Sequence, residues 1–326
     1  MALLEVKNLQ TSFFTDAGEV KAVNDVSFTL DRGKVLGIVG ESGSGKSVTA
    51  YSIMQILAGA GKIIGGSILL DGQELVNSGE SVMRTVRGNK VSIIFQDPMT
   101  SLNPTYTIGR QLTEAIRLHT SRNRDEAKER AVEMLKLVNV NDPEKRIKQY
   151  PYELSGGMRQ RVMIAMALAC EPDILIADEP TTALDVTIQL QILELMQSLQ
   201  KEMGMAIIMI THDLGVIAQM CDEVIVMYAG SICEQGTADE IFYNPRHEYT
   251  KGLLKSIPTA DSKGEKLEPI AGTPIDLLNM PAGCPFAPRC DAAMKICIRD
   301  KASSMDINEN HRATCWMNVK LQMNKE

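Results

Sequence analysis

The sequence lacks the features that would place the chain inside a membrane or on a nucleic acid. No apolar stretch approaches the roughly 20 residues that a helix needs to cross a bilayer. There is no long run of lysine and arginine and the net charge is −7, which argues against a nucleic-acid groove and a polybasic membrane anchor. The start, Met1 to Lys7, reaches charged residues too early for a signal peptide. We therefore expect a cytosolic chain, whatever it docks onto.

The sequence also lacks a C-x2-C pair, the usual signature of a zinc site. Three cysteines lie singly in apolar surroundings, where we expect buried small hydrophobes: Cys170, Cys221 and Cys233. The other four lie near the C-terminus with the spacing C-x5-C-x6-C-x17-C: Cys284, Cys290, Cys297 and Cys315. A disulfide framework is not expected in the cytosol, and iron–sulfur clusters tolerate wider spacing than zinc. Spacing alone leaves an iron–sulfur cluster, zinc and no metal equally open.

The most familiar motif that is present is G-x-x-x-x-G-K-S. It follows the apolar run 35–39 and precedes a helix-like stretch, which is the full context that a phosphate loop requires. In such a loop the glycine backbone wraps the β- and γ-phosphates, Lys46 reaches them as a point charge, and Ser47 ligates Mg²⁺. The sequence therefore predicts an ATP-type nucleotide site formed by Gly40, Glu41, Ser42, Gly43, Ser44, Gly45, Lys46, Ser47 and Val48.

Polar side chains end three further apolar runs. Asp178 and Glu179 follow the run 174–177, which reads as a buried parallel strand whose carboxyl end meets a ligand. Asp178 is predicted to hold Mg²⁺ directly or through water, and Glu179 to polarise the water that attacks the γ-phosphate. Gln96 ends another run and is expected to bind Mg²⁺ and water. His212 ends the third, where it is expected to contact the γ-phosphate and the attacking water.

A second loop, Leu154 to Gly157, opens into a helical pattern. Its two glycines leave the backbone N–H groups bare, and Ser155 adds a hydroxyl, at a helix start where the dipole favours anions. The sequence therefore predicts a second phosphate clamp made by Ser155, Gly156, Gly157 and Met158. Two clamps in one chain raise the question of whose nucleotide the second one holds.

Taken in order, these motifs resemble the ATP-binding cassette (ABC) ATPases over roughly residues 3–257. The resemblance implies an α/β fold, with a RecA-like P-loop core, an antiparallel β subdomain and a helical subdomain at about 97–155, the last of which has helical periodicity of its own. We expect an ABC ATPase domain at 1–257 and a small cysteine-containing extension at 258–326. With one cassette and no internal repeat, the chain does not match the two-cassette translation factors.

The resemblance also answers the question of the second clamp. In this family two cassettes bind head to tail, and each L-S-G-G loop closes on the ATP held by the other cassette. The chain would then be half of a catalytic unit, with Asp185 in the loop that follows the strand-end carboxylates. The aromatic residue that stacks on adenine maps to Phe13, with Phe14 as the alternative.

Residues 283–290, Gly-Cys-Pro-Phe-Ala-Pro-Arg-Cys, resemble the C-terminal extension of oligopeptide and dipeptide importer ATPases. Residues 95–104 and 244–250 are similar to the same group, and so is Met158, where a Gln is commoner in the wider family. This resemblance implies a [4Fe-4S] cluster on Cys284, Cys290, Cys297 and Cys315. It also implies a peripheral protein on the cytoplasmic face of the cell membrane. The partners implied are a second, different ATPase chain, two transmembrane permease subunits and an extracytoplasmic peptide-binding protein.

The function expected from the sequence is that of a subunit that hydrolyses ATP with Mg²⁺ to power the import of oligopeptides or dipeptides. The alternative is the same role in an importer of nickel, glutathione or another small solute, because such a subunit never touches the cargo. A soluble ABC ATPase that acts on DNA or ribosomes is a further alternative, against which the acidic charge and the C-terminal resemblance speak.

Overall fold

The computed structural model describes residues 2–97, 101–182, 184–256 and 269–323. These residues form two compact units, which we call unit 1 (residues up to 30, 35–76 and 211 onward) and unit 2 (residues 31–34 and 77–210). No helix within the described ranges is both long enough and apolar enough to span a membrane.

Unit 1 begins with an antiparallel sheet in the order β2-β1-β4-β5. Its strands are β1 (Leu4–Thr15), β2 (Gly18–Leu30), β4 (Gly61–Leu70) and β5 (Gln73–Glu74). The sheet is amphipathic, because apolar residues of β1 and β2 such as Val6 and Val26 are buried while Lys7 and Asp25 are exposed.

A second set of strands in unit 1 has the order β3-β9-β10-β12-β11. The strands are β3 (Val35–Val39), β9 (Glu223–Tyr228), β10 (Ser231–Thr237), β11 (Met305–Asn308) and β12 (His311–Ala313). β3 and β9 are parallel, and the other pairs are antiparallel. Strands β9 and β10 form a hairpin that turns at Ala229 and Gly230, both with positive φ.

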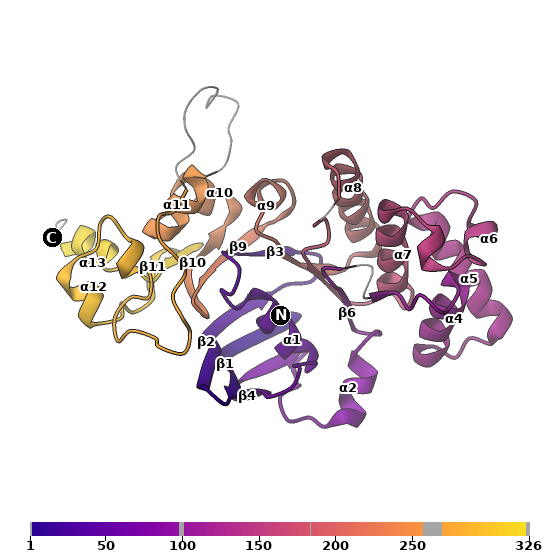
Figure 1. Cartoon of the computed structure of the whole chain (residues 1–326), viewed down its shortest axis with the longest axis horizontal. Coiled ribbons are helices and arrows are strands. Elements are labelled where there is room, and N and C mark those ends of the chain that lie inside the picture. The colour runs from indigo at the N-terminus through magenta and orange to yellow at the C-terminus, as the bar shows by residue number, and fades with distance from the viewer. Residues whose placement is uncertain (1, 98–100, 183, 257–268, 324–326) are drawn as a thin grey trace. The chain divides into compact units, whose positions relative to one another are not determined.

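The helices of unit 1 follow these strands along the chain. They are α1 (Lys46–Met54), α9 (Leu214–Met220), α10 (Ala238–Tyr243), α11 (Glu248–Lys255), the 3-10 turn η3 (Ala287–Arg289), α12 (Lys295–Arg299) and α13 (Trp316–Met323). In Figure 1 the C-terminal elements, coloured yellow, lie beside β10 and α11.

Unit 2 contains a parallel sheet in the order β8-β7-β6, with strands β6 (Val91–Ile94), β7 (Ile174–Asp178) and β8 (Ala206–Ile210). Every residue of β7 and β8 is buried, which explains why both strands read as uninterrupted apolar runs. The helices are α2 (Glu80–Val86), α4 (Ile108–His119), α5 (Arg124–Leu137), α6 (Pro143–Arg146), the 3-10 turn η1 (Pro151–Glu153), α7 (Gly156–Leu168) and α8 (Val186–Met203). Helices α4, α5 and α7 pack together (Figure 1).

The predicted boundary at residues 257–258 lies outside the described residues, so the division into 1–257 and 258–326 stays a prediction. The described C-terminal residues pack within unit 1, where β12 pairs with β10 in the register Glu234 to Ala313. The Glu234 carboxylate is fully buried beside this strand pair. It accepts hydrogen bonds from the backbone N–H groups of Arg246 and His247 and lies 2.8 Å from Nε2 of the buried His311. Because a buried carboxylate is costly unless it is hydrogen-bonded, this network ties the C-terminal strands to β10.

His247 should contribute to the pH dependence of the stability of the fold. This buried residue lies at the start of α11, where its Nδ1 accepts a hydrogen bond from the backbone N–H of Tyr249. Burial lowers the pKa of His247 to about 4, although the nearby Glu234 and Glu248 raise it. The unfolded chain therefore binds the proton more readily, and stability falls as pH drops below about 6.5. We expect this residue to cost roughly 2 kcal/mol of stability by pH 5.

His247→Asn keeps a side-chain acceptor for the helix start and removes the titration. The thermal unfolding midpoint of the variant should fall less between pH 7.5 and pH 5 than that of the wild-type chain. Equal slopes for the two proteins would contradict the assignment, and measurement at pH 7.5 controls for any general loss of stability.

Candidate nucleotide-binding site

Residues 40–47 form a loop between β3 and α1 that curls around the Lys46 ammonium group. Nζ of Lys46 donates hydrogen bonds to the carbonyls of Gly40 at 2.8 Å and Glu41 at 2.9 Å, and the residue is only 6% exposed. Because burial of an ammonium is unfavourable unless it is hydrogen-bonded, these carbonyls hold the charge in one place. A fixed cation beside a glycine-rich backbone is suited to bind phosphate oxygens.

Two glycines make the path of this loop possible. Gly45 has a φ of +101°, and a Cβ there would lie 2.4 Å from the carbonyl oxygen of Ala22. Gly40 has a φ of +149°, and its Cβ would lie 2.2 Å from the carbonyl oxygen of Met227. Helix α1 follows with no side-chain cap and no acidic residue in its first turn. Nothing acidic in that turn offsets the positive end of the helix dipole, which favours an anion.

In unit 2 the predicted strand-end residues Gln96 and Glu179 meet. Nε2 of Gln96 donates to Oε2 of Glu179 at 2.6 Å, and the Thr182 hydroxyl donates to the same oxygen at 2.9 Å. Glu179 has a φ of +48° and follows Asp178, which ends β7 and is 1% exposed. These side chains lie at or just after the carboxyl ends of the parallel strands β6 and β7.

The other predicted residues are divided between the two units. Ser47, Val48, His212 and the aromatic pair belong to unit 1, together with the rest of the phosphate loop. Phe13 is half-buried on β1 with its ring against Gly61, whose Cβ would lie 2.7 Å from the ring, whereas Phe14 is 47% exposed.

The loop 154–158 and Asp185 lie in unit 2, each at the start of a helix. Ser155 is exposed and caps α7, where its Oγ accepts a hydrogen bond from the N–H of Met158 at 3.4 Å. Asp185 caps α8 in the same way through the N–H of Ile188. A Cβ on Gly157 would lie 2.9 Å from the Ile188 side chain. Gly157 therefore permits close packing of the loop on α8, in addition to any role toward a ligand.

The predicted [4Fe-4S] cluster is wrong. Across the described residues, which include all four cysteines, no group of three or more His, Cys, Asp or Glu side chains is placed to hold a metal ion. The cysteines do line one small cavity: Cys284, Cys290, Cys297 and Cys315. Burial raises the pKa of the Cys284 and Cys315 thiols and raises that of Cys290 to about 11. Without a metal ion, burial therefore favours the thiol form of Cys284, Cys290 and Cys315.

Two residues that contact the predicted site were missed by the sequence analysis. Thr182 lies three positions after Glu179, so its contact was within reach of local reasoning about the turn. Arg289 lies 248 positions from Glu41, yet its guanidinium pairs with the Glu41 carboxylate. The only available signal for Arg289 was its place in the C-terminal motif 283–290.

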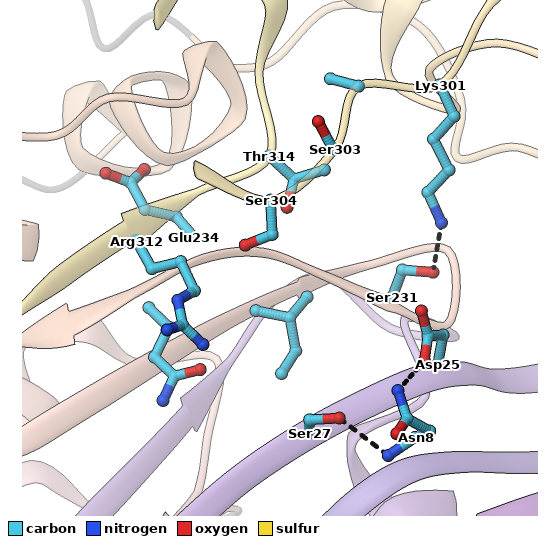
Figure 2. Close-up of a pocket in the computed structure, with 13 residues that line it drawn as sticks. Asn8, Asp25, Ser27, Ser231, Glu234, Lys301, Ser303, Ser304, Arg312 and Thr314 are labelled. Carbon is cyan, nitrogen blue, oxygen red and sulfur yellow. Dashed lines mark hydrogen bonds between the residues drawn. The ribbon is translucent and has the colours of Figure 1, made fainter. Parts of the chain in front are cut away.

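Two cavities in unit 1 differ in their relation to the phosphate loop. One, of about 280 Å³, is lined by residues 41–44 of the loop and by Pro274 to Leu277. The other, of about 560 Å³, is drawn in Figure 2 and contains none of the predicted site residues. Around it Lys301 donates to the Ser231 hydroxyl and Asn8 to the Asp25 carboxylate, so these polar groups are paired with one another. We therefore place the candidate site at the phosphate loop.

Comparison with known proteins gives matches over nearly the whole chain. Residues 23–182 match the family described as ABC transporter, and residues 233–297 match the family described as oligopeptide/dipeptide transporter, C-terminal region. The chain is 56% identical to the oligopeptide transport ATP-binding protein OppD of Bacillus subtilis, over 97% of this chain and 88% of that protein. It is 52% identical to the dipeptide transport ATP-binding protein DppD of the same organism, over 97% of this chain and 94% of that protein.

Solved structures show the same similarity at the level of the fold. A dimeric ATP-binding cassette in a post-hydrolysis state, bound to ADP and Pi, matches with a TM-score of 0.65 and 26% identity. The match covers 72% of this chain and 98% of that chain. A component of an ABC transporter complex from Clostridium perfringens matches with a TM-score of 0.63 and 30% identity, over 74% of this chain and 91% of that one.

The glycines of the loop offer a matched pair of substitutions. Gly45 and Gly43 both have positive φ, but only at Gly45 would a Cβ collide with backbone, whereas at Gly43 it would meet nothing within 4 Å. Gly45→Ala should therefore lower the thermal unfolding midpoint of the nucleotide-free protein by several degrees more than Gly43→Ala, since the two share the cost of the left-handed conformation. Equal midpoints would show that the contact with Ala22 does not constrain the loop.

Proposed function

Because the chain belongs to the ABC transporter family, in the group of oligopeptide and dipeptide transport ATP-binding proteins, we propose that it hydrolyses ATP to power peptide import across the cell membrane. The family membership and the fold class predicted from the sequence are confirmed by the matches, and so is the expectation of an ATPase. The observation that carries the peptide assignment is the similarity to such proteins over 97% of the chain, including the C-terminal region.

In this proposal ATP binds at the phosphate loop of unit 1. The backbone of residues 40–45 wraps the β- and γ-phosphates, and Lys46 supplies the positive charge that its contacts with Gly40 and Glu41 hold in place. Ser47, Gln96 and Asp178 would hold Mg²⁺, and their hydroxyl, amide and carboxylate oxygens are the hard ligands that this ion prefers. The ion would offset charge on the phosphate oxygens. Phe13, or Phe14, would stack on the adenine.

Glu179 is the proposed general base. Its carboxylate would orient the attacking water and accept a proton from it, while His212 contacts the γ-phosphate. The hydrogen bonds from Gln96 and Thr182 support this role, because they hold one oxygen of the carboxylate and so restrict its orientation. Gln96 would thereby report on whether water and Mg²⁺ are in place.

We further propose that the active unit is a pair of cassettes. Ser155, Gly156, Gly157 and Met158 of this chain would close on ATP held by the phosphate loop of the second cassette, with Asp185 at the same contact. The exposure of Ser155 at a helix start supports this, as does the dimeric state of a similar solved cassette.

The complete transporter would contain a second, different ATPase chain, two transmembrane permease subunits and an extracytoplasmic peptide-binding protein. This chain would work on the cytoplasmic face of the membrane as a peripheral subunit. Closure of the two cassettes would move the helical region that follows Gln96 and pass that motion to the permeases.

Replacement of the proposed base tests the catalytic assignment. Glu179→Gln should retain ATP binding and slow hydrolysis on the order of 10²–10⁴-fold, as expected for loss of a positioned base. The measurement is phosphate release by the assembled transporter, with nucleotide affinity determined separately. Glu194→Gln, on an exposed position of α8, is the matched control and should hydrolyse ATP at the wild-type rate. Near-normal turnover by Glu179→Gln would refute the assignment.

The pairing makes a different prediction for Ser155→Ala. In the assembled complex this substitution should reduce trapping of a photoreactive ATP analogue on the second cassette, while labelling of this chain stays close to normal. Ser81→Ala, at an exposed position outside the loop, serves as the control. Reduced labelling of this chain alone would mean that the loop acts on its own nucleotide.

A further inference from the structure

Glu41 is the only carboxylate among residues 40–47, and its side chain is paired with the C-terminal region. Nη1 and Nη2 of Arg289 donate to the two carboxylate oxygens at 2.5 and 2.9 Å, which is a bidentate ion pair. The Arg289 side chain is 4% exposed and that of Glu41 is 27% exposed. Bidentate pairs of this kind fix orientation as well as charge.

The guanidinium group of Arg289 is itself held in place. Its Nε donates to the carbonyl of Ala271 at 2.9 Å, and Nη1 donates to the Tyr228 hydroxyl at 3.3 Å. The guanidinium also lies over the rings of Tyr228 and Phe286, at 5.8 and 5.9 Å from their centroids. Arg289 is therefore oriented toward the loop by the surrounding residues of unit 1.

Glu41 is also one of the two residues whose backbone carbonyls hold Lys46. Its carbonyl accepts a hydrogen bond from Nζ of Lys46 at 2.9 Å, and its N–H donates to the Tyr249 hydroxyl at 2.8 Å. Three contacts therefore converge on one residue: side chain to Arg289, N–H to Tyr249, and carbonyl to Lys46. A shift of the Glu41 side chain would disturb the peptide group that positions the Lys46 charge.

The charge of Glu41 is unfavourable for the ligand of this loop. A carboxylate within a phosphate-binding loop repels an anionic nucleotide, and a nearby like charge acts most strongly where little water screens it. The Arg289 guanidinium carries the opposite charge at hydrogen-bonding distance. The ion pair therefore removes a repulsion that the loop sequence itself creates.

We propose that Arg289 is a positioning residue for ATP binding, which neutralises Glu41 and makes nucleotide affinity depend on docking of the C-terminal region against the phosphate loop. The inference rests on the proposed role of residues 40–47 in binding ATP. It assigns the C-terminal region a part in the ATP site through the contact of Arg289 with Glu41.

The test is a double-mutant cycle on the full chain with a fluorescent ATP analogue as the probe. Arg289→Gln should weaken binding on the order of tenfold in the wild-type background, which is a usual size for coupling between sites. In a Glu41→Gln background the same substitution should change affinity less than twofold, because no carboxylate is left to neutralise. Wild-type affinity of Arg289→Gln, or an equal loss in both backgrounds, would overturn the proposal.

Three controls make the result interpretable. Arg312→Gln removes an exposed ion pair with Asp306 in the same region and should leave affinity unchanged. Lys46→Ala tests the proposed function separately: if it binds ATP normally, the loop is not the ATP site, whatever Arg289 does. If Arg289→Gln does not fold, the coupling can be tested on the wild-type chain by amide hydrogen exchange in residues 284–299. Because coupling between two sites is reciprocal, ATP should slow the exchange of these amides. Exchange that is unchanged by ATP would reject the coupling.

Discussion

The phosphate loop of unit 1 and the strands around it are arranged about one buried charge, the ammonium group of Lys46. Backbone carbonyls of the loop hold this group. The carbonyls of Gly40 and Glu41 bind the charge, and the surrounding strands approach the loop closely enough that glycine is required at 40 and 45. The β9–β10 turn completes the enclosure, since the N–H of Gly230 donates to the Ser44 carbonyl. A rigid cradle of this kind binds an anion without reorganising when the ligand arrives.

Unit 2 places negative rather than positive charge in a buried setting, because two carboxylates stand at the end of a fully buried strand. Asp178 ends β7 and is 1% exposed, while Glu179 takes a left-handed conformation immediately after it. That conformation has an energetic cost for a residue with a Cβ, and it persists where the surroundings over-determine it. The hydrogen bonds from Gln96 and Thr182 are such determinants, and they orient the side chain at the same time.

Features fixed by local backbone geometry were predictable from the sequence, and those that depend on distant contacts were not. The phosphate loop could be placed because the spacing of its glycines and Lys46 permits few backbone paths, and Gln96 and Glu179 because parallel strands end at one edge. The pairing of Arg289 with Glu41 joins residues 248 positions apart and leaves no periodic signal. The spacing of the four late cysteines does not fix where their side chains lie. They line one cavity, but no group of three or more ligands among the described residues is placed to hold a metal ion, so the predicted cluster was wrong.

The C-terminal region is joined to the rest of unit 1 by buried polar contacts at two places, and this has a thermodynamic consequence. Glu234 binds His311 on the side of β10, while Arg289 binds Glu41 on the side of the phosphate loop. Breaking either contact leaves a polar or charged group without its partner. Each contact therefore favours the packing of the C-terminal region against the rest of unit 1, on which the other contact also depends. Because coupling between binding events is reciprocal, a region that stabilises the loop for ATP must itself be stabilised when ATP binds. Changes in the C-terminal strands can therefore reach the nucleotide through packing and charge alone.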